Sequence, residues 1–232
     1  MKRESFTLAE VLITLGIIGV VAMMVIPPLT NYIGVEQFRA KLKKEYSALL
    51  QAINFLQVNN SSIDTSSVDN FITDLSSQIS ILKKGTWGSL TTLPANFAYK
   101  CYKESGGTCN NLFYRPARDG VASFITNDGA LFIIVGAYPN CDGYNYHIKL
   151  DPSEVIPTQN VCSEIFIDLN GDKGPNQAGM DLHFFELLKK NNYYYLRPSG
   201  SGVDTNCLTG SPENYNRSLH CTARMLLDMS MP

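Results

Sequence analysis

The sequence lacks the motifs of the common enzyme classes. It contains no nucleophile elbow, no H-E-x-x-H zinc helix, no Walker phosphate loop and no dinucleotide-binding glycine pattern. Its three histidines, His147, His183 and His220, are scattered along the chain, which is more typical of structural than of catalytic residues. These absences predict that the protein is not an enzyme.

Positive charge is also scarce. Charged residues make up 17% of the chain, the formal net charge is -2, and no basic stripe is present. A protein that binds nucleic acid through its phosphates needs such a stripe. We therefore expect no nucleic-acid partner, and the frequent Asn, Ser and Tyr residues suit an exported surface that makes polar contacts.

The longest stretch without charge lies between Glu10 and Glu36 and is strongly apolar up to Pro27-Pro28. A helix of that length, rising about 1.5 Å per residue, can cross a bilayer core of roughly 30 Å. Lys2 and Arg3 precede it, and basic residues resist translocation. The sequence predicts one membrane span, with the N-terminus in the cytosol and everything after the span exported.

This stretch has two other interpretations. A secretory signal peptide needs a shorter apolar core and a small-x-small cleavage site, whereas this run is longer and leads into Pro27-Pro28 without such a site. A plain uncleaved anchor is the better alternative. It accounts for the hydrophobicity but not for the position of Glu10.

The start of the span resembles the class III signal of type IV pilins and pseudopilins. The matching residues are Ser5-Phe6-Thr7-Leu8-Ala9-Glu10-Val11-Leu12-Ile13-Thr14-Leu15-Gly16. The resemblance implies that a prepilin peptidase removes a leader, residues 1–5, by cutting between Ser5 and Phe6, and then methylates the amine of Phe6. The family usually has Gly before the cut, where this chain has Ser5, which is also small.

Glu10 lies inside the apolar run, one helical turn after Phe6. A carboxylate in a bilayer costs about 2–3.5 kcal/mol on insertion scales, less near a helix end, and is tolerated when it has a partner. Cleavage before Phe6 would create a cationic amine at the same depth. Glu10 of one chain would then neutralise the N-terminus of another, which is what the resemblance implies for filament assembly. The alternative is that Glu10 caps its own first turn or reaches the headgroups.

Beyond the assembly helix, residues 6–35, the helical pattern continues. Apolar residues recur at steps of three and four, namely Phe38, Leu42, Tyr46, Leu49, Leu50, Ile53 and Leu56. This predicts an amphipathic continuation of the helix over residues 36–58, kinked or locally melted at Pro27-Pro28. The lysines between the apolar positions are interpreted as its solvated face. In pilin-like folds such a stripe packs against an antiparallel sheet.

Residues 59–232 are long enough for one exported globular head. The runs Val121–Thr126 and Ala130–Val135 flank Asn127-Asp128-Gly129, and Asp-Gly favours a hairpin turn because Gly tolerates a positive φ. Further strands are predicted at Tyr144–Leu150, Val161–Ile167 and Tyr193–Leu196, and short helices at Phe71–Leu82, capped by Asp69 or Asn70, and at Asp181–Lys190, capped by Asp181. The expected fold is α+β and pilin-like, with three or four antiparallel strands.

Six cysteines follow the span, and none of them forms a C-x-x-C. An even number in an exported domain favours three disulfides. Sequence permits many pairings, of which sequential neighbours are the simplest. These are Cys101–Cys109, Cys141–Cys162 and Cys207–Cys221. Free buried thiols are the alternative.

One loop carries oxygen ligands at regular spacing. Asp168, Asn170 and Asp172 alternate, as in the first half of an EF-hand loop that binds Ca²⁺. The match then fails, because Lys173 stands at the position of the required Gly and Gly179 at that of the bidentate Glu. The loop is therefore not an EF-hand.

Two interpretations of this loop stay open. One is a looser Ca²⁺ site, closed by Asn176 or Asp181. The resemblance favours it, since some pseudopilins bind Ca²⁺ in a C-terminal loop. The other is a turn whose Asp and Asn side chains hydrogen-bond their own backbone amides. No other cofactor is expected.

These features predict a structural subunit, minor rather than major because its head is large and loop-rich. The resemblance implies a bacterial inner-membrane or cytoplasmic-membrane protein that passes into an extracellular or periplasmic filament, a type IV pilus or a type II secretion pseudopilus. Its partners would be the membrane, the prepilin peptidase and other pilin or pseudopilin subunits. The hypothesis from another class is a singly anchored extracellular binding protein that never polymerises.

Overall fold

The computed structural model describes residues 7–59, 63–85, 121–148, 155–171, 173–174, 179–199 and 221–227. By its internal contacts the chain divides into two units, Met1–Phe38 and Arg39–Pro232. The first unit contains the apolar part of the N-terminal helix, and the second contains a sheet with helices packed on it. The α+β class expected from the sequence is therefore confirmed.

Helix α1 spans Leu8–Val58, so the predicted end of the helix at Val58 is confirmed. The helix continues without a break through Pro27 and Pro28, and the local melting considered from the sequence does not occur. A proline removes one backbone hydrogen bond and crowds the preceding turn. A long helix tolerates this loss, because many intact hydrogen bonds remain on either side of the proline pair.

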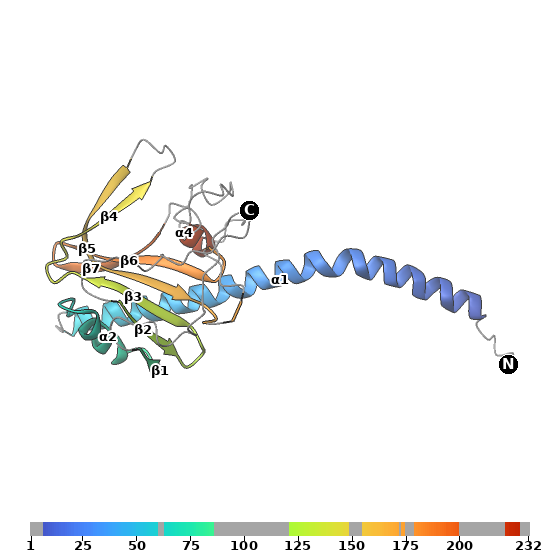
Figure 1. Cartoon of the computed structure of the whole chain (residues 1–232), viewed down its shortest axis with the longest axis horizontal. Coiled ribbons are helices and arrows are strands. Elements are labelled where there is room, and N and C mark those ends of the chain that lie inside the picture. The colour runs from blue at the N-terminus through green and yellow to red at the C-terminus, as the bar shows by residue number, and fades with distance from the viewer. Residues whose placement is uncertain are drawn as a thin grey trace. The chain divides into compact units, whose positions relative to one another are not determined.

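The second unit is built on one antiparallel sheet (Figure 1). Its strands are β1 (Ile81–Lys84), β2 (Val121–Thr126), β3 (Leu131–Ala137), β4 (Gly143–Ile148), β5 (Val155–Asp168), β6 (Leu182–Lys190) and β7 (Tyr193–Pro198). Six follow the order β1-β2-β3-β5-β6-β7, and β4 pairs with β5 off this path. The sheet is larger than the expected three or four strands.

The hairpin of β2 and β3 forms where the sequence predicted it. Phe124 pairs with Phe132, and their rings stack with centroids 4.8 Å apart. In the turn, Gly129 has a φ of 83°, and its amide donates to the Thr126 carbonyl at 2.9 Å. A glycine in this left-handed conformation is the usual way to close a three-residue hairpin loop.

The helix predicted at Asp181–Lys190 is wrong, because Leu182–Lys190 forms strand β6 between β5 and β7. On one side of β6, Phe185 stacks on Tyr46 of α1. Its neighbour Phe184 stacks on Phe166, and the Phe184 amide donates to Thr222 at 3.0 Å. Residues 182–188 are buried on both faces of the strand, so it lacks the alternation of apolar and polar residues that distinguishes a strand from a helix.

Two short helices complete the described part of the second unit. Helix α2 spans Val68–Ser76, and Ser67 caps it by accepting from the Asn70 amide at 3.1 Å. The expected helix Phe71–Leu82 with Asp69 or Asn70 as its cap is therefore wrong at both ends. Helix α4 spans Cys221–Leu226 and packs on β6. A serine hydroxyl caps an N-terminus as well as an aspartate does, and this is why the start was misplaced.

The core of the second unit lies between the sheet and the amphipathic part of α1. The buried side chains of this helix are Leu42, Glu45, Leu49, Ala52, Ile53 and Leu56. All but Glu45 are apolar, and the predicted stripe therefore faces the core. A disulfide joins Cys141, between β3 and β4, to Cys162 in β5. This confirms one of the three expected pairings.

Candidate functional site

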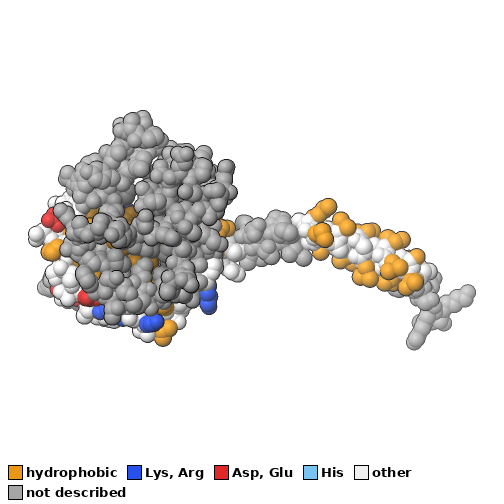
Figure 2. All heavy atoms as spheres, viewed as in Figure 1, with side chains coloured by type: hydrophobic (Ala, Val, Ile, Leu, Met, Phe, Trp, Pro, Cys, Tyr) orange, Lys and Arg blue, Asp and Glu red, His pale blue; other side chains and the backbone are white. Residues whose placement is uncertain are grey.

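The N-terminal half of α1 is apolar on all sides. Its segment Leu8–Val25 has a mean hydropathy of 2.5, and none of it is buried within the chain. On the face of this helix in Figure 2, hydrophobic side chains follow one another along its length, with no described Lys or Arg among them. A helix that is apolar all round belongs in an apolar environment. Leu8–Val25 is long and apolar enough to span a membrane.

Glu10 caps the first turn of this helix. Its Oε2 accepts hydrogen bonds from the amide and the hydroxyl of Thr7, each at 2.8 Å, and the Glu10 amide donates to Thr7 Oγ1 at 3.3 Å. This reciprocal arrangement is a capping box, which satisfies two backbone amides at the start of a helix. These contacts are those of the alternative in which Glu10 caps its own first turn. Ser5 and Phe6 lie outside the described residues.

The oxygen-rich loop after β5 is only partly described, since Asp172 and Asn176 lie outside the described residues. Asp168 Oδ1 accepts from the amides of Asn170 and Gly171 at 3.0 and 2.9 Å, as in the turn interpretation. Asp181 is fully buried, and its backbone oxygen accepts from the Leu169 amide at 2.8 Å. The Ca²⁺ site stays a prediction. A thermal melt in Ca²⁺ and in EDTA would test it.

The other predicted cysteine pairs are not placed. Cys101, Cys109 and Cys207 lie outside the described residues, and Cys221 is described only as the first residue of α4. The pairings Cys101–Cys109 and Cys207–Cys221 therefore stay predictions.

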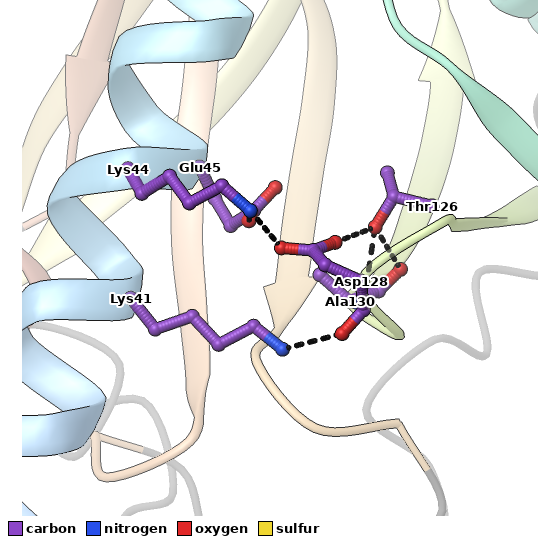
Figure 3. Close-up of polar contacts among 6 residues, drawn as sticks. All are labelled: Lys41, Lys44, Glu45, Thr126, Asp128 and Ala130. Carbon is purple, nitrogen blue, oxygen red and sulfur yellow. Dashed lines mark hydrogen bonds and ion pairs between the residues drawn. The ribbon is translucent and has the colours of Figure 1, made fainter.

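A polar cluster joins α1 to the β2–β3 turn within the second unit (Figure 3). Lys44 Nζ forms an ion pair with Asp128 Oδ2, and Lys41 Nζ donates to the Asp128 backbone oxygen at 3.0 Å. Thr126 Oγ1 donates to Asp128 Oδ1 at 2.6 Å. Asp128 therefore receives contacts from two lysines of the helix and from a hydroxyl of its own hairpin.

Glu45 is the buried member of this cluster. Only 3% of it is exposed, and its Oε1 lies 3.6 Å from Lys44 Nζ. Burial, followed by hydrogen bonding with Asp128 and the charge of Asp128, raises the pKa of Glu45 to about 7, against the opposing charges of Lys44 and Lys41. Burial also acts to raise the pKa of Asp128, but hydrogen bonds with Glu45, Lys44 and Thr126 outweigh it and hold that pKa well below its usual range.

A groove of about 410 Å³ lies beside this cluster. Its lining residues are Lys44, Glu45, Ala48, Gln51, Ala52, Phe55, Gln78, Ile79, Ser80, Thr126, Asn127 and Asp128. They come from α1, from the segment between α2 and β1, and from the β2–β3 hairpin. The groove thus combines an apolar part with two carboxyl groups and one ammonium group, and its volume lies within the range of small-ligand sites.

Sequence reasoning missed this cluster, because it interpreted the lysines between the apolar positions of α1 as a solvated face and gave no role to Glu45. The position of Glu45 in the sequence could have shown that its side chain is buried. It lies three residues after Leu42 and four before Leu49, which places it on the buried stripe. A carboxylate at such a position is expected to have a partner.

Comparison with known proteins gives no relative, since no family model, no curated protein and no solved structure matches the chain.

Proposed function

We propose that this protein is a pilin-like subunit, processed by a prepilin peptidase and assembled through its N-terminal helix into a type IV pilus or a type II secretion-like filament. The observation that carries the proposal is the helix Leu8–Val25, none of which is buried within the chain. Its apolar surface needs a bilayer before assembly and neighbouring helices after it. The role is structural rather than enzymatic.

The residues at the start of the span support the same function. They match the class III signal from Ser5 to Gly16, with Glu10 one turn after Phe6. Exported heads with a helix packed on an antiparallel sheet are typical of the family that the signal resembles. The packing of Tyr46 in α1 on Phe185 in β6 belongs to an architecture of this kind.

In the isolated chain Glu10 is held by the capping box, so its proposed contact in the filament must replace or share those bonds. Its hydrogen bonds to Thr7 lie on the surface of the isolated chain, where a neighbouring chain can reach the carboxylate. In the proposed filament the carboxylate leaves Thr7, or shares its second oxygen, to neutralise the amine of a neighbouring chain. A charge-assisted contact of this kind is roughly twice as strong as a neutral hydrogen bond.

A pair of substitutions separates the cap from the interchain contact. Glu10→Gln keeps the capping box, since Gln serves at this position as well as Glu, but it removes the charge. Glu10→Ala removes both. We expect both variants to insert into the membrane and both to lose incorporation into filaments. Normal incorporation of Glu10→Gln, with loss only for Glu10→Ala, would show that the cap is the function of Glu10.

The first experiment is mass spectrometry of the protein and its N-terminal peptide, taken from its native membrane. We expect a chain that begins at N-methylated Phe6. A chain that still begins at Met1 would favour the second candidate function, a singly anchored extracellular binding protein. That candidate is favoured by one observation, the open groove beside Glu45 and Asp128 in the second unit.

A further inference from the structure

We draw no further inference here: the strongest candidate, the groove between α1 and the β2–β3 hairpin beside Glu45 and Asp128, carries none, because Lys41 and Lys44 already balance its two carboxyl groups and nothing in the structure shows what occupies it.

Discussion

The side-chain amide of Gln57 pairs with both backbone polar groups of Tyr194. Gln57 Oε1 accepts from the Tyr194 amide at 2.7 Å, and Gln57 Nε2 donates to the Tyr194 carbonyl at 3.0 Å. Tyr194 lies in β7, at one edge of the sheet. Gln57 therefore takes the place that a further strand would occupy, and the end of α1 protects this edge from pairing with another chain.

Gln57→Ala should lower the free energy of unfolding by about 1–2 kcal/mol, because it leaves two part-buried backbone groups without their partner. The measurement is urea unfolding of the full chain in detergent, followed by circular dichroism. Gln51→Ala is the control, since Gln51 is exposed on the same helix. Equal losses in both variants would mean that helix propensity, and not the contact with Tyr194, explains the change.

Stability should fall as the pH rises from about 4.5 to about 7, because folding raises the pKa of Glu45 from 4.5 to about 7. Between these values the folded protein holds a proton that the unfolded chain has released, so each step up in pH favours unfolding. Glu45→Gln cannot ionise. It should therefore match the wild type near pH 5 and exceed it near pH 8, by on the order of 1 kcal/mol. Thermal melts at the two pH values test this, and a wild type that gains on the variant with rising pH would refute it.

Gly129→Ala should destabilise the β2–β3 turn by about 1–2 kcal/mol, because residue 129 has a φ of 83° and an L side chain is strained there. Gly174→Ala is the control, since a Cβ at Gly174 meets nothing within 4 Å and its φ is not in the left-handed range. Thermal melts of both variants measure the difference. The Gly129 variant should also loosen the contacts of Lys41 and Lys44 with Asp128.

Replacing both Cys141 and Cys162 by Ser should lower stability by about 2–4 kcal/mol, as expected for a closed loop with a sequence separation of 21. Most of this loss arises because the unfolded chain gains conformational freedom. Urea unfolding of the double variant gives the value. Peptide mapping without reduction should recover Cys141 and Cys162 in one linked fragment, and separate fragments would contradict the structure.

The parts of the fold with strong local signals were predictable from the sequence. The period of the apolar residues predicted α1 to Val58, and Asp128-Gly129 predicted the hairpin. Cys141–Cys162 was one of the sequential pairings, which are the simplest of the many that six cysteines permit. In each case the deciding interaction is local in sequence or belongs to a short loop.

The parts that depend on distant segments were not predictable. Leu182–Lys190 forms a strand because β5 and β7 pair with it on its two edges and Tyr46 of α1 packs on Phe185, and all of these partners are distant in sequence. The role of Glu45 likewise depends on Asp128, which only the tertiary fold brings near it. The residue pattern within one segment does not show which distant segment will pack against it. Glu10 differs, since its partner Thr7 lies one turn away and the capping pattern is visible in the sequence.

Strand β5 changes its neighbour along one edge, and this has a mechanical consequence. Its residues from Val155 to Val161 pair with β4, and those from Ser163 to Asp168 pair with β3. The bond from Cys162 to Cys141 lies between these two stretches. A force that pulls β4 away from β5 would break the hydrogen bonds between them one after another and stop at this disulfide. The pairing of β4 with the first half of β5 can thus yield under load while the strands β3, β5, β6 and β7 stay joined.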